Sequence, residues 1–139
     1  MTSELEMWKK AGKMASEARE FGKTLLKEGA NLYEIAVKIE DFIRNKGAKP
    51  AFPVQISINN IGAHYTPVPN DEMTIKKGDV VKLDLGTQIE GYIGDTALTI
   101  EVGTNKYEKI IKTSEAALNA AIKVCKPGVK LREIGAEIS

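Results

Sequence analysis

Apolar residues recur at helical spacing in two stretches near the start of the chain. The first stretch covers residues 3–28 and ends at Gly29, a residue suited to a left-handed helix cap. The second covers residues 31–46 and opens with Asn31, followed three positions later by Glu34, in a variant of the capping box. The spacing therefore predicts two amphipathic helices.

The pattern changes after residue 50. Residues 51–102 carry β-branched residues and short alternations between Pro and Gly turn signals, which predicts strands. From about Thr104 the helical period returns, so residues 102–139 are expected to be mainly helical. The order of these segments indicates an α+β fold, with the first two helices packed on an antiparallel sheet.

Two segments of the chain resemble each other. Residues 27–40 match residues 126–139 at a constant offset of 99, with six identities in fourteen positions and no gap. Two capped helices can share this much by chance, so chance similarity is the alternative to an internal repeat. A repeat would make residues 1–101 a first unit and residues 102–139 the helical start of a second.

Composition argues against several classes of binding partner and several cellular locations. The 139 residues carry a net charge of +1, which gives no bulk attraction to nucleic acid or to an anionic membrane. A single cysteine, Cys125, rules out an internal disulfide, fits a reducing compartment and is expected to be an inert, buried thiol. The N-terminus lacks the apolar segment of a signal peptide, and no apolar run reaches the ~20 residues of a membrane span. We therefore expect a cytoplasmic protein that binds neither nucleic acid nor membrane.

Two carboxylates, Asp84 and Asp95, stand in apolar, strand-like surroundings. In an antiparallel hairpin turning at Ile89–Glu90 they would lie directly opposite each other, although this is not a favoured turn pair and Gly91 could shift the turn. Adjacent anions repel, and a divalent cation would relieve the repulsion. The alternatives are that one aspartate is an exposed turn residue, or that Lys82 pairs with Asp84.

The chain has one histidine, His64, which follows a Gly-Ala step and precedes Thr-Pro in an expected loop. A lone histidine is more often structural than catalytic, but a loop position of this kind is common among functional residues. Spacing alone leaves both interpretations open.

Two motifs carry a family resemblance. "PAFPVQISINNIGAHYTP" and "GDVVKLDLGTQIEGYIGDTALT" resemble the type II methionine aminopeptidases of archaea and eukaryotes, and the short N-terminus resembles the archaeal branch. The resemblance implies the pita-bread fold, which has two pseudo-symmetric halves, with this chain matching the N-terminal half. It also supports the internal repeat.

The resemblance further implies roles for individual residues. Asp84 and Asp95 match the family's metal-binding aspartates, with Asp95 bridging two divalent ions (Co, Mn, Fe or Zn). His64 matches the histidine that hydrogen-bonds the scissile peptide and helps to stabilise the tetrahedral intermediate, and Phe52 matches a wall of the methionine pocket. Thr99 would donate a hydrogen bond to a carboxylate. The implied reaction is two-metal hydrolysis that removes the initiator methionine from a nascent polypeptide.

The family's metal centre needs five protein ligands, and this sequence supplies only the two aspartates. It contains no second histidine, and Glu133 and Glu137 fall in an expected structural helix. We therefore expect a truncated chain that is inactive alone and that associates with itself or with a C-terminal half. The alternatives are an Xaa-Pro peptidase of the same fold and a non-catalytic binding module of the same fold.

Overall fold

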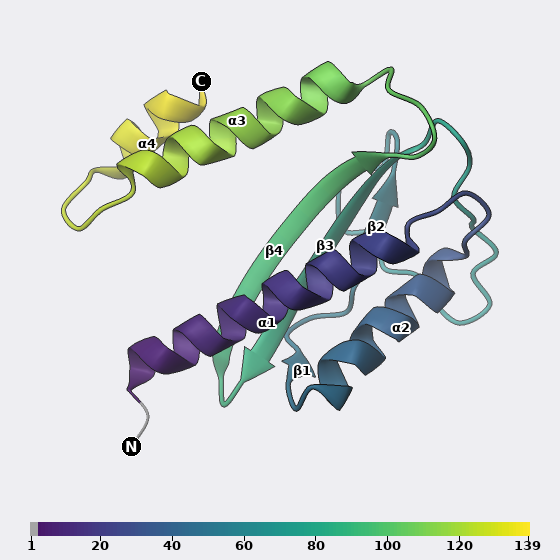
Figure 1. Ribbon diagram of the computed structural model, residues 1–139, viewed down its shortest axis with the longest axis horizontal. Coiled ribbons are helices and arrows are strands. Elements are labelled where there is room, and N and C mark those ends of the chain that lie inside the picture. Colours follow the sequence, from purple (N-terminus) through teal and green to yellow (C-terminus); the bar gives the residue numbers. More distant parts are fainter. Residues whose placement is uncertain (1–2) are drawn as a thin grey trace. The chain divides into compact units, whose positions relative to one another are not determined.

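The computed structural model describes residues 3–139, which form two compact units separated after Thr104. The first unit contains both predicted helices and all the strands (Figure 1). Its elements are α1 (Glu4–Leu25), α2 (Leu32–Asn45), β1 (Lys49–Pro50), β2 (Gln55–Ile58), β3 (Val80–Ile89) and β4 (Tyr92–Glu101). The second unit contains α3 (Glu108–Val124) and α4 (Leu131–Ile138).

Polar caps fix where the first two helices begin. The Ser3 hydroxyl accepts a hydrogen bond from the Glu6 backbone N–H, and the Asn31 side chain accepts one from the Glu34 N–H. Each cap satisfies a backbone donor that has no partner inside its helix. At the other end α1 stops at Leu25, three residues before the boundary expected from the apolar pattern.

The sheet is antiparallel and built around β3. One edge of β3 pairs with β4 along its whole length, and β1 and β2 pair with different parts of β3. The helices α1 and α2 cover one face of this sheet (Figure 1). Alternate residues of β3, namely Val81, Leu83 and Leu85, are fully buried in the core. The intervening residues of β3, including Asp84, are on the other face.

The turn between β3 and β4 corrects the expected register. Glu90 and Gly91 form a two-residue turn with φ of 52° and 90°, the positive values that a type I′ turn requires. Glycine adopts such a φ without steric cost, so the turn centres one residue later than Ile89–Glu90. Asp84 consequently faces Ala97, and the prediction that Asp84 and Asp95 stand directly opposite each other is wrong.

The loops that follow α1 and α3 have the same geometry. Gly29 and Gly128 have φ of 82° and 85°, and in both loops the next residue donates its backbone N–H to the carbonyl two positions before the glycine, at 3.1 Å. The helices α2 and α4 each begin three residues after the glycine. The two loops lie 99 positions apart, which is the offset of the sequence similarity.

Candidate active site

The two aspartates share one face of the β3–β4 hairpin. Asp84 pairs with Ala97, and Asp95 pairs with Gly86, so the carboxylates are diagonal neighbours on adjacent strands. Side chains in such a diagonal relation start about 7–8 Å apart, within reach of a common ligand. The structure therefore brings the sequence-predicted acid pair together, on the face of the sheet opposite the helices.

The acid pair is electrostatically unfavourable on its own. Burial raises the pKa of Asp84, and the negative charge of Asp95 raises it further, while the nearby His64 lowers it. Asp84 is half-buried whereas Asp95 is exposed. A bound cation at this place would offset both the desolvation of the Asp84 carboxylate and its repulsion by Asp95.

His64 is on the loop that runs alongside β2. Its backbone is left-handed, with φ of 66°, which is uncommon for a residue other than glycine and is concentrated at functional sites. The next residue fastens the loop, because the Tyr65 N–H donates to the Ser57 hydroxyl at 3.2 Å and the Ile56 N–H donates to the Tyr65 carbonyl at 2.8 Å. The exposed imidazole is close enough to Asp84 for its charge to act on that carboxyl.

Phe52 lies at the same level of the sheet as Asp95. The Ala51 N–H donates to the Gly86 carbonyl at 2.9 Å, which holds the chain before Phe52 against β3. The Phe52 ring covers Gly86, the residue directly opposite Asp95. An apolar ring therefore borders the acid pair, where the resemblance expects a wall of the methionine pocket.

Thr99 and Gln55 flank the acid pair on the same face. Thr99 is the other diagonal neighbour of Asp84, and it faces Lys82 across the hairpin. Its role as a donor to a carboxylate stays a prediction. Gln55 faces Asp84 directly from β2, and its side-chain oxygen is buried without a hydrogen-bond partner among the described residues. Such an acceptor suits the N–H donor of a ligand.

Sequence reasoning missed Gln55 and Gly86. Both could have been found from period-two alternation, since Gly86 is two residues after Asp84 and so shares its face. The pairing of Gln55 with Asp84 depends on the register between β2 and β3, which the sequence does not reveal.

The donors suit a divalent cation but form only part of a site. Carboxylate and amide oxygens are the ligands that hard divalent cations prefer. Within residues 3–139, no three His, Cys, Asp or Glu side chains are grouped so that they could hold a metal ion. The chain's own residues therefore fit two ligand positions, Asp84 and Asp95.

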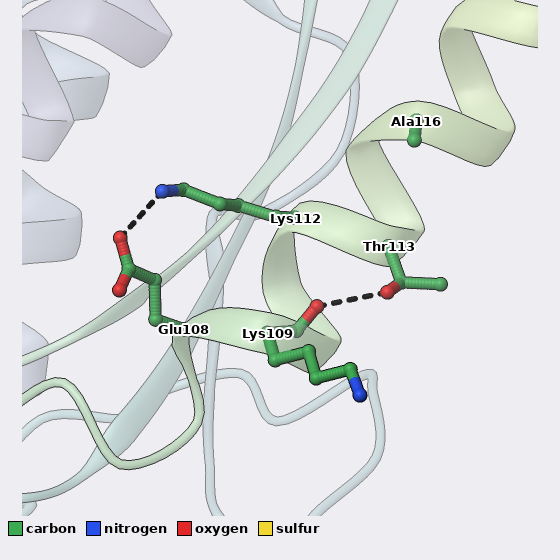
Figure 2. Close-up of a pocket in the computed structure, with 5 residues that line it drawn as sticks. All are labelled: Glu108, Lys109, Lys112, Thr113 and Ala116. Carbon is green, nitrogen blue, oxygen red and sulfur yellow. Dashed lines mark hydrogen bonds and ion pairs between the residues drawn. The ribbon is translucent and has the colours of Figure 1, made fainter.

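A surface hollow on α3 has no part in this constellation. It is lined by Glu108, Lys109, Lys112, Thr113 and Ala116 (Figure 2). Glu108 and Lys112 form an ion pair at 2.6 Å, and the Thr113 hydroxyl donates to the Lys109 carbonyl at 2.8 Å. These polar groups are engaged with one another, so the hollow offers no comparable chemistry.

Comparison with curated proteins finds methionine aminopeptidases. The enzyme of Pyrococcus abyssi is 48% identical over 128 residues, covering 92% of this chain and 43% of the relative. The enzyme of Methanothermus fervidus is 41% identical, covering 94% of this chain and 76% of the relative. The chain thus spans less than half the length of the Pyrococcus relative. None of the helices in residues 3–139 has the length and hydropathy of a membrane span.

Solved structures show the same fold. The methionine aminopeptidase of Thermotoga maritima matches with a TM-score of 0.90 at 28% identity, covering 99% of this chain and 59% of that one. The prolidase of Pyrococcus horikoshii matches with a TM-score of 0.86 at 30% identity, covering 99% of this chain and 41% of that one. These matches confirm the α+β class and the first half of the pita-bread fold.

The model of metallopeptidase family M24 matches residues 6–139, nearly the whole chain. The match agrees with a carboxylate pair suited to divalent cations on the open face of the sheet. The chain therefore belongs to metallopeptidase family M24.

Proposed function

We propose that this chain supplies part of the active site of a methionine aminopeptidase, which removes the initiator methionine from nascent polypeptides. The observation that carries the proposal is the acid pair of Asp84 and Asp95 on one face of the hairpin, bordered by Phe52. The curated relatives are named methionine aminopeptidases, and this supports the substrate class.

In this proposal Asp84 and Asp95 would each be a ligand of the divalent ions (Co, Mn, Fe or Zn) that the complete site binds. Bound ions of this kind polarise a peptide carbonyl and supply a nucleophile from water. His64 donates a hydrogen bond to the oxygen on which negative charge develops. Phe52 binds the methionine side chain, and Thr99 orients a carboxylate.

We also propose that residues 27–40 and 126–139 are equivalent segments of two related halves, with the division between residues 101 and 102. The similar glycine φ and the equivalent backbone hydrogen bond at the offset of 99 support this interpretation. The remaining metal ligands would then come from residues equivalent to the rest of the longer relatives. A substrate made of nascent chains would place the protein in the cytoplasm.

A chimera tests the proposal. The chain would replace the 43% of the Pyrococcus abyssi enzyme that it matches. With Co or Mn added, we expect the chimera to release methionine from Met-Ala-Ser. Asp84→Asn and Asp95→Asn should each lower kcat/KM by at least ~100-fold, since second-shell changes alone cost 10–100-fold at metal sites. The 139-residue chain alone should show no turnover.

The substrate separates this function from its closest competitor. Prolidases are also structural neighbours of the chain, so a Met-Pro dipeptide should be included beside Met-Ala-Ser. Preferential cleavage of Met-Pro would favour an Xaa-Pro peptidase. A well-folded chimera that cleaves neither peptide would contradict the proposed function and favour a binding module.

A further inference from the structure

Gly86 is in tight contact with the ring that borders the acid pair. A Cβ added to Gly86 would lie 2.5 Å from Phe52 Cε1, 3.0 Å from Phe52 Cδ1 and 3.1 Å from the Ala51 Cβ. Distances below 3.0 Å require a neighbour to move. Gly86 is itself buried and its φ is not positive, so it is glycine because of this contact and not because of its backbone conformation.

The strand around Gly86 is held from the opposite face. On the next rung of the hairpin, Thr87 pairs with Gly94, and the Thr87 hydroxyl donates to the Ala11 carbonyl of α1 at 2.9 Å. A Cβ on Gly94 would meet that same carbonyl at 2.4 Å, so helix backbone and strand backbone are already in contact. β3 therefore cannot retreat toward α1 when a side chain is added at Gly86.

The ring is consequently the part that must move. The contact atoms of Phe52 are at the end of a rotatable side chain, whereas the strand is fixed between the ring and the helix. A Cβ on this face points out of the sheet, so it would push the ring away from the sheet surface beside Asp95.

We propose that Gly86 is a positioning residue, which seats the Phe52 ring against the sheet beside Asp95 and thereby sets the length of side chain that the pocket accepts. The selectivity part of this proposal rests on the proposed peptidase function. The contact between Gly86 and Phe52 stands independently of it.

A stability cycle in the 139-residue chain tests the contact. We expect Gly86→Ala to lower the melting temperature by about 4 °C or more, the effect of a modest overpacking penalty in a small domain. In a Phe52→Ala background the same change should cost clearly less, because the contacts with the Phe52 ring are gone and only the 3.1 Å contact with the Ala51 Cβ remains. An equal loss in both backgrounds would overturn the proposal.

Gly94→Ala is the matched control. Its clash is with the backbone of α1, so the Phe52→Ala change should not rescue it. A direct readout is available by NMR, since the ring current of Phe52 should displace the Gly86 Hα resonances in the wild-type chain and not in Phe52→Ala. Unshifted resonances in the wild-type chain would also overturn the proposal.

The chimera tests selectivity. Gly86→Ala should lower kcat/KM for Met-Ala-Ser about tenfold, mainly through KM, the usual effect of misfitting one methylene. A peptide with the shorter aminobutyryl residue in place of methionine should lose less, and Phe52→Ala should remove the difference. Equal losses for both peptides would refute the selectivity role. A wild-type chimera that cleaves neither peptide would instead refute the proposed function, and the stability cycle would still decide the contact.

Discussion

At the scale of single residues, few nearby side chains offset the negative charge of the acid pair. Lys82 is on the same face of β3, and the sequence allowed it to pair with Asp84. Its ammonium instead donates to the Asn59 carbonyl at 2.7 Å, and burial lowers its pKa. Lys82 therefore does not neutralise the acid pair, and among the described residues the only opposing effect on the pKa of Asp84 comes from the nearby His64.

The raised pKa of Asp84 predicts a pH-dependent stability. A carboxyl whose pKa is raised by folding stabilises the native state below its unfolded pKa of about 3.9, and that contribution is lost as pH rises through the folded pKa. Asp84→Asn should therefore raise the melting temperature of the metal-free chain at pH 7, and the difference should disappear below about pH 4. Thermal melts in EDTA across this range measure it.

Asp79→Asn is a control with the opposite sign. The Asp79 carboxylate accepts hydrogen bonds from the Asn59 side chain at 2.9 Å and from the Lys76 N–H at 2.7 Å. Its removal should lower the melting temperature at pH 7. If Asp84→Asn also destabilised the chain at pH 7, the account of an unfavourable acid pair would be wrong.

At the scale of elements, the turn at Glu90–Gly91 determines which residues face each other across the β3–β4 hairpin. Both turn residues have positive φ, a conformation that asparagine and glycine adopt more readily than glutamate does. The register that results places Gly86, and not Asp84, opposite Asp95. The separation between Asp84 and Asp95 across the hairpin therefore depends on the turn.

Two substitutions test the turn. Glu90→Asn creates the Asn-Gly pair preferred in type I′ turns and should stabilise the chain by about 0.5 kcal/mol. Gly91→Ala places a side chain at φ of 90° and should cost about 1–2 kcal/mol. Urea denaturation would give both values. An unchanged midpoint for Gly91→Ala would show that the hairpin can adopt another turn.

These elements also show how far sequence reasoning extends. The start of the second helix at Asn31 was predictable from the sequence because a cap is a local interaction between residues three positions apart. Both aspartates and His64 could be proposed as site residues because their residue types are unusual in their settings. The register between β3 and β4 could not be predicted from the sequence, since it depends on the φ of two turn residues. The contact of Phe52 with Gly86 joins distant segments and leaves no local pattern.

At the scale of the whole molecule, the buried apolar core belongs to the first unit. Every residue of its main cluster precedes Thr104. In the second unit Ala121 is the buried residue of α3, and α4 has none. Several large apolar side chains of this unit are exposed, including Leu131 at 85% and Ile110 at 68%. Two helices with so little burial gain little stability from packing.

Hydrogen exchange should resolve the two units. Amides of α3 and α4 should exchange faster than those of α2 and β3 by at least about tenfold, because local opening costs less where little apolar surface is buried. Mass spectrometry of the exchanged chain would measure this. Equal protection in α3 and β3 would contradict the assignment of the core to the first unit.

The exposed apolar residues of α3 predict self-association. The side chains of Leu118 and Ile122 are 60% and 59% exposed. They are four positions apart, so they lie on the same face of the helix. Sedimentation should show association that grows with concentration and that Leu118→Lys weakens. Asn119→Lys adds the same charge at an exposed neighbouring position and should have little effect. A monomer at high concentration would contradict this expectation.

The contact between Thr87, Gly94 and Ala11 has a consequence for interpreting sequence variants. At Gly94 the backbone of β4 lies directly against the backbone of α1, and the face of the hairpin that carries Asp95 is on the other side of that backbone. A substitution that shifts the α1 backbone at Ala11 would shift the hairpin with it. Ala11 lies in a helix and is far from the acid pair in sequence. A substitution at Ala11 should nevertheless be classed with substitutions that affect the active site.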